Sequence, residues 1–318
     1  MAPADALVRR TLPTVRDHGM ATVRETESMG PSDDIATNPI ALVATDLDGT
    51  LLNSDELISP RTLAAIHELM ANGIHLLLVT GRPPRWLPTV LDQIGVPLTC
   101  ICANGAIAIE PATHEILFQT GISGVDALHA AEVLREVVPE VGFAIERAPL
   151  PADLWNHTAA FAHDHDYHPR WPTMDGTPVA ALHELIDDRL VLKLLARSEL
   201  RLGQERVDEI VHAARAALGQ RVEVTHSERD RLLLEISAPG VDKGTALARV
   251  ASDWAIPAER IVAVGDMMND LPMLEWAGHP YAVANAHPHL RAMARALPSN
   301  DDDGLAVLLE GVNRNALP

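Results

Sequence analysis

Residues 41–53 read ALVATDLDGTLLN, and this stretch decides the fold. An apolar, β-branched run ends at two acidic residues, Asp46 and Asp48, on a turn that contains a glycine. Two carboxylates this close repel each other and resist joint ionisation. A divalent cation between them would relieve the repulsion, as would a mechanism in which one acid is a nucleophile and the other exchanges a proton. Acid pairs are also common in turns, so a functional role for these two residues depends on the motifs in the rest of the chain.

The composition indicates a globular protein of two domains. The chain has 318 residues, 47% of them hydrophobic, and no uninterrupted apolar stretch of membrane-spanning length. Its formal net charge of -19 argues against nucleic acid or an anionic membrane as a partner, because both select for clustered lysine and arginine. An anionic substrate would therefore need local positive charge at its site, from a metal ion or a few cationic side chains.

Cysteine and lysine are both rare. Cys100 and Cys102 alternate along a predicted strand, which is poor geometry for a disulfide between them, and two cysteines cannot make a structural zinc site. We therefore predict a cytoplasmic protein. Only Lys193 and Lys243 are lysines, against 23 arginines. A lysine retained in such a chain can be one that arginine cannot replace, such as a compact ammonium against phosphate.

Apolar strands alternate with helical segments from residue 40 onward. We predict strands at 40–45, 74–79, 98–103 and 260–264, and helices at 59–72, from residue 83, and at 243–254. Continuous apolar strands joined by helices indicate an α/β fold with a doubly wound parallel sheet. Ligands bind beyond the carboxyl ends of such strands, so the residues that follow them are expected to converge in one crevice: Asp46, Thr80, Asn104 and Asp266.

The sequence changes character between residues 123 and 237. Helices at 125–137 and 200–218, and strands at 143–146, 190–196, 221–225 and 231–236, surround a segment rich in Pro, His and Trp. We predict an α+β cap domain at 123–237, inserted into a discontinuous core domain at 40–122 and 238–318. Residues 1–39 show no sustained periodicity and are expected to be a disordered extension. The sequence HDHDYH at 163–168 fits either a transition-metal site or, more commonly, an exposed loop or surface helix.

Four motifs carry the chemistry: DLDGT at 46–50, TGR at 80–82, KG at 243–244 and GDMMND at 265–270. In this order and spacing they resemble the haloacid dehalogenase superfamily of phosphohydrolases. The similarity is greatest to the Cof-type branch, in which a large α+β cap follows the third core strand. ANGA at 103–106, GVDKGTAL at 240–247, GDMMNDLPML at 265–274 and VANA at 283–286 extend it. The resemblance covers residue 40 to the C-terminus and implies a Rossmann-like core.

The resemblance also implies roles that agree with the chemistry of the residues. Asp46 would attack phosphorus to form an aspartyl-phosphate, and Asp48 would protonate the leaving oxygen and then deprotonate water. The Thr80 hydroxyl and the Lys243 ammonium would hold the transferring phosphoryl group. Mg²⁺ would be bound by Asp46, the backbone carbonyl of Asp48, and Asp266.

Further residues have more than one interpretation. The resemblance places Arg82 near the substrate phosphate, where a fork of donors is suitable, but a salt bridge to the acids is an alternative. Asn269 would contact the phosphate or metal-bound water, and Asp270 would support Lys243. Asn104 would shape the loop beneath the site. Asp242 is expected to be the N-cap of the following helix.

The predicted function is Mg²⁺-dependent hydrolysis of small phosphomonoesters, with sugar phosphates and flavin-type or pyridoxal-type phosphates as the substrate classes. We expect no nucleic-acid or membrane partner, and a monomer or homodimer. A phosphomutase or phosphotransferase with the same core is one alternative, which product analysis would separate. A non-catalytic binding module is another alternative. Such a module would be expected to have lost one of the two acids of the first motif, but both are present.

Overall fold

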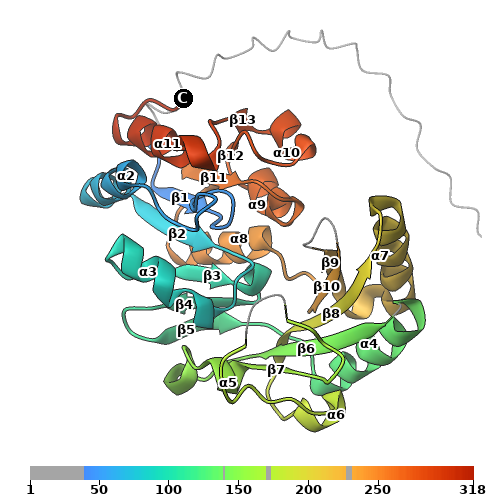
Figure 1. Ribbon diagram of the computed structural model, residues 1–318. Helices are drawn as coiled ribbons and strands as arrows, with labels where there is room; N and C mark the ends of the chain where they lie inside the picture. Colours follow the sequence, from blue (N-terminus) through green and yellow to red (C-terminus); the bar gives the residue numbers. More distant parts are fainter. Residues whose placement is uncertain (1–38, 139, 170–172, 227–230) are drawn as a thin grey trace, which may run out of the picture.

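The computed structural model describes residues 39–138, 140–169, 173–226 and 231–318. Two β-sheets organise this part of the chain, one of eight strands and one of five (Figure 1). The extension predicted at residues 1–39 lies outside the described residues, except for Pro39. In the described part, no helix has both the length and the apolar character needed to cross a membrane.

The eight-stranded sheet is parallel over most of its width. Its strands follow the spatial order β13 (Arg295–Ala296), β12 (His279–Ala282), β11 (Ile261–Gly265), β1 (Leu42–Thr45), β2 (His75–Val79), β3 (Cys100–Cys102), β4 (Ile107–Glu110) and β5 (Glu115–Gln119). The first six pair in parallel, whereas β4 and β5 add an antiparallel extension. The predicted α/β class is confirmed, but this extension was not predicted, because its two short strands follow β3 without an intervening helix.

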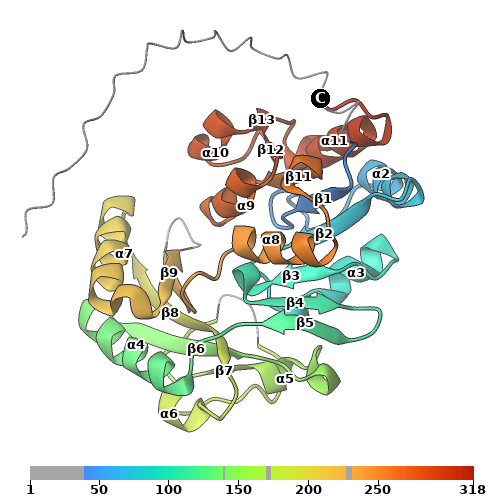
Figure 2. The ribbon, with the colours of Figure 1, turned by 180° about the vertical axis from the view of Figure 1, so that it is seen from behind.

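Helices cover both faces of this sheet. Figures 1 and 2 show α2 (Pro60–Ala71), α3 (Pro88–Ile94) and α11 (Gly304–Asn313) over one face, and α8 (Lys243–Asp253) and α9 (Leu271–Trp276) over the other. The short α10 (Pro288–Met293) lies between β12 and β13 in the chain. Connections lead from β1 to β2 and β3 on one side, and from β11 to β12 and β13 on the other. The strand order therefore reverses around β1, and ligands bind at such a point.

The five-stranded sheet is antiparallel. Its order is β7 (Phe161–His163), β6 (Val141–Arg147), β8 (Val191–Arg201), β10 (Arg231–Ser237) and β9 (Glu223–His226). α4 (Gly124–Val137) and α7 (Gln204–Leu218) pack on one face of it, and two short helices, α5 (His157–Ala160) and α6 (Leu182–Leu185), lie in the connections (Figure 1). All five strands fall within the predicted cap, whose boundaries stay a prediction.

The helix predicted to begin at residue 200 begins at Gln204 instead. β8 continues to Arg201, because its last residues still pair with β10 through a register shift. The apolar residues near position 200 therefore belong to an extended strand, and Gly203 is the N-cap of the helix. A run of alternating apolar residues that continues into a helix gives no clear signal for where the strand ends.

Alternation along β8 and β10 separates two environments. Leu192 and Leu194 are fully buried, and the helices α4 and α7 cover this side of the sheet. Lys193 and Leu195 point the opposite way and line a cavity. Because successive side chains of a strand point to opposite faces, the five-stranded sheet has one apolar face and one face that carries charges.

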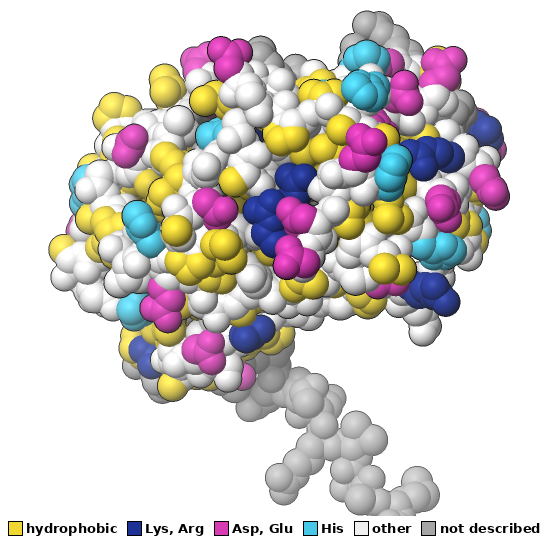
Figure 3. Space-filling model, turned by 90° about the horizontal axis from the view of Figure 1, so that it is seen from below, with side chains coloured by type: hydrophobic (Ala, Val, Ile, Leu, Met, Phe, Trp, Pro, Cys, Tyr) yellow, Lys and Arg dark blue, Asp and Glu magenta, His cyan; other side chains and the backbone are white. Residues whose placement is uncertain are grey.

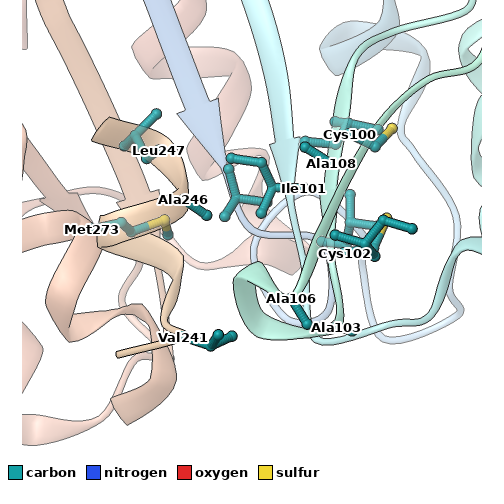
Figure 4. Close-up of a cluster of buried hydrophobic side chains, with 14 of the residues drawn as sticks. Cys100, Ile101, Cys102, Ala103, Ala106, Ala108, Val241, Ala246, Leu247 and Met273 are labelled. Atoms are coloured by element: carbon teal, nitrogen blue, oxygen red, sulfur yellow. The ribbon is translucent and has the colours of Figure 1, made fainter. Parts of the chain in front are cut away.

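An apolar cluster lies beneath the loops that follow β3 and precede α8. Figure 4 shows Ile101 from β3 directed toward Ala246 of α8, with Met273 from α9 beside that helix, whereas Cys100 and Cys102 lie on the other side of β3. All five side chains are buried. Burial raises the pKa of the Cys102 thiol above its usual value, and Cys100 behaves in the same way. Both thiols are free, as predicted.

The surface carries mixed charge. On the side seen from below in Figure 3, basic and acidic side chains lie beside one another near the middle of the face.

Candidate active site

Four loops converge at the carboxyl ends of adjacent strands. Asp46 follows β1, Thr80 follows β2, Asn104 lies in the short 3-10 turn after β3 (η2, Ala103–Gly105), and Asp266 follows β11. A cavity of about 1400 Å³ opens between these strand ends and the charged face of the five-stranded sheet. The predicted convergence of these residues therefore produces a cleft with walls from both sheets.

Asp46 is held by a buried network of charges. Its backbone N–H donates to the carbonyl of Val264 on the neighbouring strand. The Lys243 ammonium donates to Oδ1 of Asp46 at 2.6 Å and to Oδ1 of Asp270 at 2.5 Å. Oδ2 of Asp270 accepts the backbone N–H groups of Asp266 and Met267. One lysine thus links the first motif to the last.

The start of α8 places this lysine. Asp242 is the N-cap, as predicted, and its side chain accepts the N–H of Thr245 at 2.7 Å. The next residues of the helix run against the first turn of α9: a Cβ on Gly244 would lie 2.4 Å from the carbonyl oxygen of Pro272. Only glycine permits this approach, which brings the fully buried Lys243 to the carboxylates.

Burial sets the electrostatics of the network. Removal from water raises the pKa of Asp46, and Lys243 opposes this shift without cancelling it, while Asp270 and Asp266 add to it. For Lys243, burial alone would lower the pKa, but Asp270 and Asp46 outweigh burial and raise it. Lys243 is therefore an ammonium. A further cation beside Asp46 would favour the ionised carboxylate of Asp46.

Three carboxylates form a group that fits a metal ion. Asp46, Asp266 and Asp270 each offer one oxygen, all within 4.8 Å of one another, and no other such group was found among the described residues. Hard oxygen donors suit Mg²⁺. Both oxygens of Asp270 already accept hydrogen bonds, so Asp46 and Asp266 are the better ligands. Gly49, with φ +79°, leaves room at this point, since a Cβ there would lie 2.6 Å from Oδ2 of Asp266.

Asp48 makes a two-point ion pair with Arg82. Nε and Nη2 of Arg82 donate to Oδ2 and Oδ1 of Asp48, at 2.8 Å and 2.5 Å. Burial lowers the pKa of Arg82, but the hydrogen bonds and charge of Asp48 raise it more. Of the two interpretations that the sequence left open, the structure shows the salt bridge. The buried Thr80 hydroxyl accepts the N–H of Arg82 at 3.0 Å and so shapes this loop.

Asn104 connects several parts of the site. Its backbone has a left-handed φ of 56°, and its N–H donates to the carbonyl of Thr80 at 3.0 Å. Its side-chain Nδ2 donates to Glu235 at 2.8 Å, and its Oδ1 accepts from Nδ2 of Asn269 at 3.1 Å. The predicted loop-shaping residue therefore also joins the loop after β2 to the loop after β11.

The predicted site residues divide by position. Six line the cavity: Asp46, Asp48, Arg82, Asn104, Asp266 and Asn269. The other three are fully buried: Thr80, Lys243 and Asp270.

Several charged residues of the opposite wall were missed. Lys193 lies in the crevice with 6% exposure. Glu235 and Glu146 face the same cavity from β10 and β6, and the buried pair of Arg85 with Glu146 is 2.8 Å long. The signal was a charged residue within an otherwise apolar strand, because alternation places such a residue on the face opposite to the buried side chains.

Among the described residues, the histidine-rich segment at 163–168 contributes no side chain to a group that could hold a metal ion. Oδ1 of Asp164 accepts the N–H groups of Phe143 and Tyr167, and Nδ1 of His163 bonds to the carbonyl of Asp164. These buried groups hold β7 against β6, and they do not belong to the one carboxylate group described above.

Comparison with known proteins identifies the family. Residues 43–309 match the family of haloacid dehalogenase-like hydrolases. The chain belongs to this family. A 5-amino-6-(5-phospho-D-ribitylamino)uracil phosphatase from Bacillus subtilis is 28% identical over 284 residues, which are 85% of this chain and 96% of that protein. A phosphoglycolate phosphatase from Natronomonas pharaonis is 29% identical over 260 residues, 81% of this chain and 91% of that one.

Solved structures share the fold. A phosphatase of the same superfamily from Bacteroides thetaiotaomicron has a TM-score of 0.70 at 21% identity and covers 90% of this chain and 99% of its own. A protein from Thermotoga maritima has a TM-score of 0.67 at 24% identity, covering 85% and 97%. The predicted Cof-type family is confirmed, and the family and its relatives identify this haloacid dehalogenase-like protein as an enzyme of the phosphatase class.

Proposed function

We propose that this enzyme hydrolyses phosphomonoesters of small metabolites through an aspartyl-phosphate on Asp46, with Mg²⁺ as cofactor. One observation carries the proposal: a buried strand-end carboxylate, held by Lys243 and adjacent to Asp266, reaches the wall of a large cleft. A carboxylate that is buried, oriented and next to a metal-binding acid is equipped to be a nucleophile. The family membership supports the same chemistry.

In the first step, a carboxylate oxygen of Asp46 forms a bond to phosphorus, and the ester bond between phosphorus and the leaving oxygen breaks. The carboxylic acid of Asp48 gives its proton to that oxygen, so the alcohol leaves neutral and Asp48 becomes a carboxylate. Asp48 is suited to this exchange because its side chain is 56% exposed and reaches the cavity.

In the second step, water replaces Asp46 on phosphorus. The Asp48 carboxylate takes a proton from the water, whose oxygen bonds to phosphorus while the bond to Asp46 breaks. Inorganic phosphate is released, Asp46 is again a carboxylate, and Asp48 again carries a proton. Both steps use the same two residues, so the cycle closes without any other reactant.

Positive charge at the site would come from Mg²⁺ and from Lys243. Asp46, Asp266 and the backbone carbonyl of Asp48 would hold Mg²⁺, which supplies charge stabilisation for the phosphoryl oxygens when bound. Lys243 orients Asp46 and, with the Thr80 hydroxyl and Asn269, would hold those oxygens. Phosphoryl transfer depends mostly on such positioning and neutralisation.

Arg82 would change partners during the reaction. In the structure it occupies both oxygens of Asp48, so Asp48 must lose at least one of these hydrogen bonds before it can act as an acid. A substrate phosphoryl group is a stronger attraction for a guanidinium fork than one carboxylate. Transfer of Arg82 to the phosphoryl group would bind substrate and release Asp48 together.

The leaving group would occupy the cavity between the two sheets. Its volume of about 1400 Å³ exceeds what a phosphate requires, and its walls include the aromatic side chains of Trp86, Phe161 and Tyr167. Sugar phosphates and flavin-type or pyridoxal-type phosphates are the classes to test, and the ribitylaminouracil phosphate named for the Bacillus subtilis relative belongs in the same panel.

The deciding experiment is phosphate release from this panel, with and without Mg²⁺, beside Asp46→Asn. Metal-dependent release by the wild type that is lost in the variant is expected. Undiminished release by folded Asp46→Asn would reject the mechanism, and isomerised sugar phosphate in place of inorganic phosphate would identify a mutase.

A further inference from the structure

We propose that Lys193 and Glu235, on the five-stranded sheet, are positioning residues that hold the phosphate-binding loop of the opposite sheet. This inference rests on the phosphatase function proposed above. Neither residue belongs to the four motifs, and neither is required for the proton or phosphoryl transfers. What distinguishes them is that both reach across the cleft to the loops that surround Asp46.

Lys193 makes the first contact across the cleft. Its ammonium donates to the carbonyl of Gly81 at 2.9 Å and to Oε2 of Glu235 at 2.7 Å. Gly81 stands between Thr80 and Arg82, in the loop that we assign to phosphate binding. The lysine is only 6% exposed, so this bond forms in a largely dry environment where its loss is costly.

Glu235 makes the second contact. Its Oε2 accepts from Lys193 and also from Nδ2 of Asn104 at 2.8 Å. Asn104 in turn accepts from Asn269 through its Oδ1, and its N–H donates to the carbonyl of Thr80. A single carboxylate oxygen therefore connects the five-stranded sheet to the loops after β2, β3 and β11.

The arrangement has a mechanical consequence. The bond between Lys193 and Glu235 joins two strands of one sheet, whereas the bonds to Gly81 and Asn104 join the two sheets. If the sheets separate to admit substrate, the pair stays intact and the two cross-cleft bonds break. When the sheets close, both bonds form again and fix the Thr80–Gly81–Arg82 loop. Closure would thus complete the phosphate site.

The test compares three variants of the pair with one control. Lys193→Met removes the donor to Gly81, and Glu235→Gln removes the charge that Lys193 and Asn104 share. Glu235→Asp keeps the charge but is one methylene shorter, so it cannot reach both partners. Glu209→Gln is the control, since it breaks the exposed pair of Glu209 with Arg206 on α7, where both side chains are 57% exposed.

We measure kcat, KM, the inhibition constant of inorganic phosphate, and the melting temperature, using the substrate that wild type hydrolyses best. Each pair variant should lower kcat/KM by roughly ten- to hundredfold and weaken inhibition by phosphate. The Lys193→Met/Glu235→Gln double variant should lose little more than the worse single variant, because the two residues act as a unit. Glu209→Gln should match wild type.

Two results would overturn the proposal. If folded variants keep kcat/KM and phosphate inhibition within twofold of wild type while the melting temperature falls, the pair only stabilises the fold. If the losses of the single variants multiply in the double variant, the residues act independently. Failure of the proposed function itself is recognised separately, because wild type would then release no phosphate. Glu235→Asp, which keeps a negative charge near Lys193, covers the case in which Lys193→Met does not fold.

Discussion

The two lysines of the chain lie on opposite walls of one cleft. Lys243, at the start of α8, is fully buried between the carboxylates of Asp46 and Asp270. Lys193, on β8, is 6% exposed and shares its hydrogen bonds between Glu235 and the carbonyl of Gly81. The first ammonium acts on the residue that we propose to react, whereas the second acts on a loop that would bind the substrate.

The contacts of the two lysines indicate why arginine would not replace them. A guanidinium is a planar fork that favours two-point contact with one carboxylate, as Arg82 shows with Asp48. An ammonium is compact and directs its hydrogens to separate acceptors in different directions. Lys243 and Lys193 each contact two acceptors on different elements, which is the geometry that an arginine would not reproduce in the same space.

The largest effect on activity is expected at Asp46, one of the two acids that Lys243 contacts. Asp46→Asn should lower phosphate release by a factor on the order of 10⁴ or more, because the amide is not a nucleophile. The side chain is nearly isosteric and can still accept a hydrogen bond from Lys243, so the circular dichroism spectrum should not change. A residual activity above one per cent of wild type, free of contaminating phosphatase, would show that Asp46 does not form the covalent intermediate.

The second prediction compares the two lysines directly. Lys243→Met leaves Asp46 and Asp270 buried without their ammonium, which should cost roughly 3–5 kcal/mol of unfolding free energy in addition to activity. Lys193→Met leaves only Glu235 without an ammonium, and Glu235 still accepts a hydrogen bond from Asn104. The loss of unfolding free energy should therefore be smaller than in Lys243→Met. Urea unfolding of both variants measures the difference. Equal losses would mean that the two lysines do not differ in the way their burial indicates.

The parts of this site that could be predicted are those encoded locally. Asp46, Thr80 and Asp266 each end an apolar strand, and the carboxyl ends of parallel strands meet at one edge of the sheet, so their convergence followed from the order of elements. Lys243 was recognised because the order and spacing of the four motifs resemble the haloacid dehalogenase superfamily, and because lysine is rare in this chain.

The opposite wall could not be predicted, for a physical reason. Whether Glu235 faces the cleft depends on which side of β10 is covered by α4 and α7, and this is decided by packing between distant segments. The buried pair of Arg85 with Glu146 joins residues 61 positions apart, one in the segment between β2 and α3 and the other on β6 of the five-stranded sheet. No local pattern encodes such contacts. The start of α7 at Gln204 was misplaced for the same reason, since pairing with β10 extends β8.

The third prediction concerns the metal on the Lys243 side of the cleft. Asp266→Asn should raise the Mg²⁺ concentration required for half-maximal activity by roughly ten- to hundredfold, because it removes one of the charged ligands. Magnesium titration of phosphate release measures this shift, with Glu235→Gln as the comparison. The latter should leave the Mg²⁺ requirement unchanged, since Glu235 does not belong to the carboxylate group. If the Mg²⁺ requirement rises in both variants, the five-stranded sheet also contributes to metal binding.

The smallest effect is on stability and tests whether burial or Lys243 dominates at Asp46. Burial raises the folded-state pKa of Asp46 above its unfolded value of about 4. Between these two values the unfolded chain releases its proton first, so this carboxyl destabilises the metal-free protein increasingly as the pH rises, and not at all below pH of about 4. Asp46→Asn lacks this cost. In EDTA, its unfolding free energy relative to wild type should therefore increase from acidic to neutral pH.

Magnesium should reverse the order of stability of the two proteins, so that wild type is more stable than Asp46→Asn at neutral pH. A cation that binds the charged form of Asp46 stabilises folded wild type, and Asp46→Asn, which lacks one charged ligand, should gain less. Urea titrations at several pH values, in EDTA and in saturating Mg²⁺, would measure the difference in unfolding free energy between the two proteins and show whether its sign changes. If Asp46→Asn is the less stable protein in EDTA at neutral pH, the ion pair with Lys243 outweighs burial even without metal. The buried lysine would then be sufficient to keep the nucleophile charged, and the metal would be needed for the substrate alone.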